Sequence, residues 1–165
     1  LNGWQYSLAV TAFDEGDTEN KLESLESSLL ANSERVIPGS LPTSDANTKI
    51  GVYPNPYYGE AYWDGSSERL RKLYFYNLPA DCEIVIYTLS GDIVKRIDHT
   101  STSNGSDVRW FEVYAKDGSQ VMTGGEHPWD LVTDDDQAIA TGLYLFTVKD
   151  RATGDIKTGK FLVIK

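Results

Sequence analysis

The sequence predicts an all-β protein built around an antiparallel β-sandwich. Short segments rich in β-branched and aromatic residues recur along the second two-thirds of the chain, and turn residues separate them. Aromatic residues make up 12% of the 165 residues, and there are 14 glycines, a composition that favours strands and tight turns. Six or more short strands joined by glycine-containing turns, without a convincing helix among them, are typical of a sandwich.

The first element is a strand over residues 4–13, WQYSLAVTAF. Its side chains alternate, so that Trp4, Tyr6, Leu8 and Val10 share one face and the strand is expected to be half-buried. A polar turn, DEGDTEN, follows it. Residues 21–31 then allow two interpretations. The leucines fit one face of a helix, but a serine-rich second strand paired with the first fits equally well.

A linker is predicted over residues 32–49, where Pro38, Gly39 and Pro42 stand among polar residues. The next segment, VYPNPYYG at 52–59, is neither a helix nor an inner strand, because each proline lacks a backbone donor and restricts the residue before it. We therefore expect it to fix the direction in which the linker joins the sandwich. Its tyrosines would close the end of the core while their hydroxyl groups stay in water.

The strands of the sandwich follow from the remaining apolar segments. They are expected at 69–77, 82–89, 92–98, 107–115, 142–149 and 156–164. Both faces of 84–89 are apolar, which predicts a central strand. We expect Ile84, Ile86, Tyr144 and Phe146 to be buried. In the last strand, Phe161 and Val163 should share one face, with Leu162 and Ile164 on the other.

Composition excludes several classes of partner. The net charge of −10 argues against a nucleic-acid surface and against electrostatic adhesion to anionic lipid. No stretch approaches the ~20 apolar residues that span a bilayer, so no membrane insertion is predicted. Leu1 is not an initiator, the sole methionine is Met122 and no signal peptide is seen. The chain is therefore expected to be a piece of a longer protein.

The chemistry-bearing residues predict no enzyme and no cofactor. Cys82 is the single cysteine and is expected to be a buried structural thiol. His99 and His127 lie in sequence typical of turns, and no nucleophile-and-base motif accompanies them. The three aspartates Asp134, Asp135 and Asp136 are weak calcium candidates. A solvated turn is the favoured interpretation, so no metal site is predicted.

Several of these segments together resemble a known family. They are VYPNPYYG, CEIVIYTLSGDIVKRI, WDLVTDDDQAIATGLYLFTV and TGKFLVIK. In this order they resemble the C-terminal sorting domains of type IX (Por) secretion cargo and the Ig-like module of flagellar hook-capping proteins. The shared pattern falls at Tyr53–Pro56, Ile86–Val94, Trp129–Asp130, Gly142–Tyr144 and Lys160–Lys165. Between Trp110 and Trp129 the sequence departs from it, and GGEHPW there is expected to be a surface loop or extra hairpin.

The resemblance implies a domain organisation. Residues 50–165 would form an Ig-like β-sandwich. YSLAVTAFDEGD at 6–17 resembles the penultimate strand of a fibronectin type III domain. Residues 1–31 would then be the last strands of such a domain, forming a β-hairpin fragment ahead of the linker.

It also implies a function. The chain would be a non-catalytic module of a secreted bacterial protein. After it enters the periplasm, the secretion machinery would recognise it and export it to the extracellular space or the cell surface. Recognition is expected at Lys160, Phe161, Leu162, Val163, Ile164 and Lys165, because a strand with exposed lysines can add to the edge of a partner's sheet. The same lysines could instead only protect an edge strand from aggregation.

Two other functions remain open. The sandwich could be a structural or adhesive module that holds an extracellular assembly together, with the upstream polypeptide or another subunit as its partner. Alternatively, it could bind glycans through an exposed coplanar row of aromatic side chains, Tyr57, Tyr58, Tyr62 and Trp63.

Overall fold

The computed structural model describes residues 6–17, 19–31, 33–36, 38–59, 72–103, 108 and 122–165. The chain divides into two compact units, Leu1–Pro38 and Gly39–Lys165. Every regular element within the described ranges is a β-strand, which confirms the all-β class. Those ranges contain no helix long and apolar enough to cross a membrane. The predicted strand 107–115, Val108 apart, lies outside them.

The first unit is a long hairpin. Strand β1 (Tyr6–Ala9) pairs antiparallel with β2 (Ser33–Val36), which falls inside the segment predicted to be a linker. Between these strands the two arms meet at single bridges, Phe13 with Glu26 and Asp17 with Leu22. The helical interpretation of 21–31 is therefore wrong. The segment is the returning arm of the hairpin, although the regular second strand lies just after it.

Polar side chains join the two arms of this hairpin. The Ala12 amide donates to Oγ of Ser27 at 3.0 Å, and the Leu25 amide donates to a carboxylate oxygen of Asp14 at 3.1 Å. The apolar side chains point into solvent, with Leu8 56% and Val10 84% exposed. The prediction that one face of this strand is buried is therefore wrong. Alternation of apolar and polar residues indicates a strand, but it does not show whether another element packs against the apolar face.

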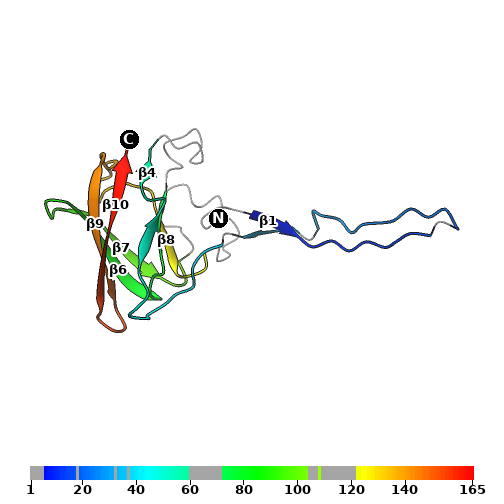
Figure 1. The fold of residues 1–165 in the computed structure, drawn as a ribbon, viewed down its shortest axis with the longest axis horizontal. Coiled ribbons are helices and arrows are strands. Elements are labelled where there is room, and N and C mark those ends of the chain that lie inside the picture. Colours follow the sequence, from blue (N-terminus) through cyan, green and yellow to red (C-terminus); the bar gives the residue numbers. More distant parts are fainter. Residues whose placement is uncertain are drawn as a thin grey trace. The chain divides into compact units, whose positions relative to one another are not determined.

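The second unit contains a five-stranded sheet in the order β4-β10-β9-β6-β7 (Figure 1). Its strands are β4 (Tyr57–Tyr58), β6 (Asp81–Thr88), β7 (Ile93–Thr100), β9 (Gly142–Asp150) and β10 (Ile156–Ile164). Four of them confirm predicted strands to within two residues at each end. All neighbours are antiparallel except β4, which runs parallel to β10.

A three-stranded antiparallel sheet completes the sandwich, in the order β3-β5-β8. It consists of β3 (Gly51–Tyr53), β5 (Leu73–Tyr76) and β8 (Glu126–Trp129). The four residues of β8 are all buried. The expectation that GGEHPW is a surface loop or extra hairpin is therefore wrong: pairing with β5 sets His127 opposite Phe75 inside the fold.

The core lies between the two sheets and is centred on aromatic side chains. Phe75 of β5 meets Phe146 of β9 edge-on, with ring centroids 5.2 Å apart. Phe161 of β10 contacts both rings and also Trp129 of β8. Ile84, Ile86, Tyr144 and Phe146 are buried as predicted.

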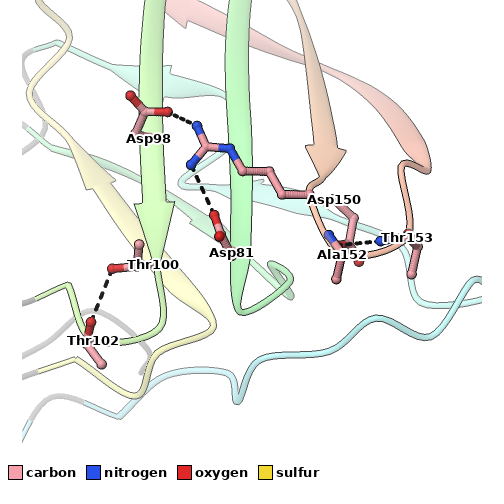
Figure 2. A network of polar contacts seen from close by, with 8 residues as sticks. Asp81, Asp98, Thr100, Thr102, Asp150, Ala152 and Thr153 are labelled. Carbon is pink, nitrogen blue, oxygen red and sulfur yellow. Dashed lines mark hydrogen bonds and ion pairs between the residues drawn. The ribbon is translucent and has the colours of Figure 1, made fainter.

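Polar contacts tie the β9–β10 turn to its neighbours (Figure 2). The guanidinium of Arg151 pairs with Asp81 of β6, at 3.1 Å, and with Asp98 of β7. A carboxylate oxygen of Asp150 accepts the Ala152 amide at 2.8 Å. Because the Arg151 pairs are exposed, they contribute little free energy and mainly orient the turn.

Replacing Ile86 with alanine should test the position of the core. Ile86 is fully buried on a central strand, so its truncation should lower the free energy of unfolding by about 2–5 kcal/mol. Urea unfolding followed by tryptophan fluorescence measures this. Ile93→Ala is the matched control, because Ile93 is 48% exposed and its truncation should cost about 0.5 kcal/mol or less. Equal losses for the two variants would contradict this placement of the core.

Candidate functional site

The last strand, β10, has one face in the core and one face outside. Phe161 and Val163 are buried, whereas Leu162 and Ile164 are half-buried on the opposite face. Lys160 and Lys165 are exposed. This confirms the predicted division of the strand into two apolar faces.

From Lys160 onward, the backbone of β10 is paired on both sides. Strand β9 lies on one side. On the other side the Asn55 side chain makes the hydrogen bonds that a neighbouring strand would make. Its amide nitrogen donates to the Lys160 carbonyl at 3.4 Å, and its oxygen accepts a hydrogen bond from the Leu162 amide at 3.2 Å. Farther along, the Gly59 amide donates to the Ile164 carbonyl at 2.8 Å.

This pairing corrects one part of the sequence-based expectation. The backbone of 160–164 cannot add to the edge of another sheet while Asn55 and β4 occupy its outer side. The amide of Lys165 is also engaged, because it donates to the Thr141 hydroxyl at 2.9 Å. The outward side chains of this segment are not covered by these contacts.

Those side chains belong to a larger apolar surface, which we name the outer patch. Its members alternate with buried neighbours and lie on the outer face of the five-stranded sheet: Tyr58, Leu143, Leu145, Leu162 and Ile164. In the strand register Leu143 is opposite Leu162, and Leu145 is opposite Lys160. Leu143 and Leu145 are each 37% exposed. The outer patch is therefore an exposed apolar surface with Lys160 of β10 beside it.

The aromatic row predicted for glycan binding is not formed at Tyr57. Pairing of β4 with β10 turns Tyr57 into the core, where it is fully buried, and leaves Tyr58 exposed on the outer face. Tyr62 and Trp63 lie outside the described residues. Tyr57 therefore cannot stack on a sugar.

The three aspartates lie in an exposed turn beside β7. Lys95 places its ammonium nitrogen 3.2 Å from a carboxylate oxygen of Asp134, and the Arg96 amide donates to the other oxygen at 3.3 Å. Asp135 donates its amide to the Thr133 hydroxyl. Among the residues that the structure describes, no cluster of metal-ligating side chains is found. Asp134 thus serves to hold the turn against β7.

The two histidines are not in turns, which corrects that expectation. His99 lies in β7 and His127 in β8, and both are buried. The signal that could have placed His99 was its spacing of two from Ile97, which is also buried. Cys82 is buried as predicted. Burial, with the nearby carboxylates of Asp150 and Asp81, raises the pKa of its thiol to about 12, so it is not a reactive thiolate.

A buried carboxylate that the sequence did not indicate joins three segments. Glu126 of β8 is 1% exposed and accepts hydrogen bonds from the Tyr53 hydroxyl at 2.7 Å and the Ser40 amide at 2.8 Å. Burial raises the pKa of the Tyr53 hydroxyl far above its ordinary value. The hydrogen bond to Glu126 and the charge of that carboxylate make smaller contributions to this pKa in the same direction. Residues 39–42, within the predicted linker, are held here, since the Gly125 amide also donates to the Ser40 carbonyl.

Comparison with known proteins gives limited similarity. No family model matches the chain, and no curated protein matches it. Two solved structures from Porphyromonas gingivalis are similar to it. One is PorZ, described as an essential bacterial surface component of the type IX secretion system: it is 24% identical, with a TM-score of 0.44, over 70% of this chain and 11% of PorZ.

The other is the dimeric latent form of PorU, which is 15% identical with a TM-score of 0.39. The alignment covers 99% of this chain and 12% of PorU. The chain thus spans about a tenth of the length of either protein. Because both TM-scores are below 0.5, neither similarity establishes a function for it.

Asn55→Ala should loosen the outer side of β10. The Leu162 amide loses its acceptor, so its hydrogen exchange should become about five- to tenfold faster, as expected for one lost hydrogen bond. Nuclear magnetic resonance measures this amide directly. The amides of Phe161 and Val163 should change less, and Asn47→Ala, in an exposed turn, should leave all three unchanged. An unchanged rate at Leu162 would show that Asn55 does not hold the strand.

Calcium should be dispensable. Lys95 and the Arg96 amide already pair with the Asp134 carboxylate. A chelator should therefore leave the melting temperature within about 1 °C of its value in added calcium. A loss of about 1 kcal/mol of stability would lower it by several degrees in a domain of this size. Differential scanning calorimetry checks this. A fall of many degrees on chelation would restore Asp134, Asp135 and Asp136 as calcium ligands.

Proposed function

We propose that residues 39–165 form a non-catalytic sorting or anchoring module of a bacterial protein exported by type IX secretion to the cell surface. The observation that carries the proposal is the arrangement of β10. Its backbone is closed on both sides, yet Lys160, Leu162 and Ile164 face outward beside the rest of the outer patch, and Lys165, which follows the strand, is exposed. The motif resemblance gives this surface a class of partner, the secretion machinery.

The physical properties of the outer patch suit protein recognition. Exposed leucines on a sheet favour contact with another apolar surface, because burying them removes apolar area from water. The lysines beside them stand on a chain with a net charge of −10, so their positive field is local. Such a surface would attract a partner with apolar and acidic side chains and orient it by charge.

A structural role is the second candidate, and a separate observation favours it. The hairpin of the first unit exposes large apolar side chains on both arms, including Leu8 at 56% and Leu25 at 71%. Monomeric proteins rarely leave contiguous surfaces of this kind uncovered. A neighbouring segment or subunit covering the hairpin would make this chain part of a larger extracellular assembly.

Changing Lys160 and Lys165 to serine should test the sorting role. Both side chains are exposed, so the variant should keep the core and unfold within about 0.5 kcal/mol of the parent. Fused to a passenger in a host competent for type IX secretion, it should fold but accumulate in the periplasm. Fractionation with a passenger-specific antibody measures the distribution. Lys149→Ser, an exposed lysine on β9 away from the outer patch, is the control and should be delivered normally.

Two outcomes would contradict the proposal, one in its choice of recognition residues and the other in the sorting role as a whole. Normal surface delivery of the lysine variant would remove the lysines from the recognition surface. Normal delivery of a passenger that lacks all of 51–165 would remove the sorting role itself and favour the structural candidate.

A further inference from the structure

The hairpin of the first unit has an apolar surface. Throughout 6–17 and 19–31 every residue is exposed or half-buried, and none is buried. Its exposed large apolar side chains are Tyr6, Leu8, Val10, Phe13, Leu22, Leu25, Leu29 and Leu30. They are eight of the fifteen such side chains in the described part of the chain, although the second unit is much the larger. Exposed apolar surface is therefore concentrated on the hairpin.

The backbone of the hairpin is open to a further strand. Within the described residues β1 and β2 form a sheet of only two strands, so both are edge strands. A two-stranded hairpin is marginally stable in water, and a third strand or a packed layer is what makes it stable. The outer side of an edge strand carries N–H and C=O groups that an added strand can pair with.

The hydrogen bonds between the arms show which of these groups point outward. The Asp14 amide donates to the Leu25 carbonyl at 3.1 Å, and the Ser27 amide donates to the Ala12 carbonyl at 2.9 Å. These two bonds flank the bridge between Phe13 and Glu26, which is therefore a pair without hydrogen bonds of its own. In such a pair the amides and carbonyls of both residues face the outer sides of the two arms.

The charge of the hairpin restricts what can add to it. Six acidic residues and one lysine lie between positions 14 and 26, an excess of five negative charges. Neutral donors contact the acidic groups. Asp14 accepts from the amides of Gly16 and Leu25, for example, so its charge is not cancelled. Hydrogen bonds from Asn20 lower the pKa of Asp17, which keeps this carboxylate ionised at neutral pH.

Acidic and apolar side chains also share one cavity near the end of the hairpin. Its volume is about 440 Å³, and it is lined by the carboxylates of Asp14, Glu15, Asp17 and Glu23 and by Leu22 and Leu25. A lysine or arginine side chain suits these surroundings, because its apolar stem can lie on the leucines while its charged end meets the carboxylates. A second copy of the hairpin, or an anionic lipid surface, would be repelled by the same charge.

We propose that the hairpin, residues 6–31, is a docking element to which another polypeptide adds an extended segment as a third β-strand. The added segment carries both apolar and basic side chains. Its backbone pairs with the outer side of one arm, its apolar residues lie beside the leucines, and its basic residues lie beside the carboxylates. This inference rests on the structural candidate of the previous subsection, to which it gives a class of partner, and is independent of the sorting role.

Short synthetic peptides can serve as probes of the full chain. A peptide of alternating leucine and lysine should bind saturably, as followed by the fluorescence anisotropy of a labelled peptide. A leucine–glutamate peptide and a serine–lysine peptide should each bind at least about tenfold more weakly, because one is repelled and the other buries no apolar area. Equal binding of the three peptides, or no saturable binding of the first, would overturn the proposal.

Two charge variants separate a specific site from the overall acidity of the chain. Glu15→Gln with Glu23→Gln should weaken binding of the leucine–lysine peptide about threefold or more, and the effect should shrink at high salt. Asp135→Asn with Asp155→Asn changes the net charge equally, but on exposed residues of the second unit. This control should bind as the parent does. Equal losses in the two variants would show adhesion through net charge alone and would overturn the proposal.

Two apolar variants apply the same comparison to the leucines. Phe13→Ser with Leu25→Ser should weaken binding about tenfold or more, because both side chains would be buried by the added strand. Leu89→Ser with Ile156→Ser removes two side chains of similar exposure, 67% and 61%, from the second unit and should have no effect. Self-association of the full chain that the hairpin variant abolishes would overturn the proposal in favour of a second copy. Binding of uncharged lipid vesicles that it abolishes would do so in favour of a membrane.

Nuclear magnetic resonance tests whether the peptide is added as a strand. At saturation, hydrogen exchange at the outward amide of Phe13 or of Glu26 should slow about tenfold or more, as expected for a new hydrogen bond. The amides of Asp14 and Ser27, which are already bonded between the arms, should change less. Unchanged exchange at both Phe13 and Glu26 would overturn the proposal even where the peptide binds.

The structural candidate itself fails in a different way. Deleting 6–31 would then leave the size of the complexes that the chain forms in its host unchanged, as measured by size-exclusion chromatography. That result would overturn the docking element as well. Failure of the peptide tests alone would overturn only the basic, extended partner, and the delivery of a passenger by the sorting role should be the same in all hairpin variants.

Discussion

The contact on which the second unit depends is the packing of Phe161 between the two sheets. Its ring touches Phe75 and Trp129 of the smaller sheet and Tyr144 and Phe146 of its own. The Phe146 ring, which Phe161 contacts, lies directly against Gly159, where an added Cβ would overlap it. The last strand is thus first of all a core element. Because its inner face is packed in the core, the position of its outer face is fixed as well.

The motifs that suggested a family act through local geometry. Trp129 donates its indole N–H to the Val132 carbonyl at 3.0 Å, and Asp130 accepts the Val132 amide, so the Trp-Asp pair shapes a tight turn after β8. The Tyr144 hydroxyl donates to the Ala140 carbonyl while its ring stacks on Phe161. Such contacts lie close in sequence or within one strand pair. That is why strand positions, turns and the two faces of β10 could be predicted from the sequence alone.

What the sequence could not predict depends on partners far along the chain. Glu126 is tolerable in the core because Tyr53 and Ser40 donate hydrogen bonds to it. The two buried histidines contact each other, and His99 also contacts the Gly124 carbonyl. A polar residue looks like a turn residue until its partner is known. Tyr57 was misplaced for a related reason, since only the pairing of β4 with β10 decides which of two adjacent tyrosines faces inward. In the first unit, the sequence showed the alternation of apolar and polar residues that is typical of a strand, but it did not show whether another segment covers the apolar face.

The closure of β10 also limits how any partner can use it. An open, apolar strand edge would pair with other chains indiscriminately, and proteins avoid this by covering or charging such edges. Asn55 covers the edge with one side chain, and its flanking prolines have no N–H to donate. In the proposed sorting role, recognition would therefore depend on the leucines and lysines of the outer face and not on backbone hydrogen bonds, which any strand can make. A partner that reads this pattern must match both apolar shape and charge, which is the more selective arrangement.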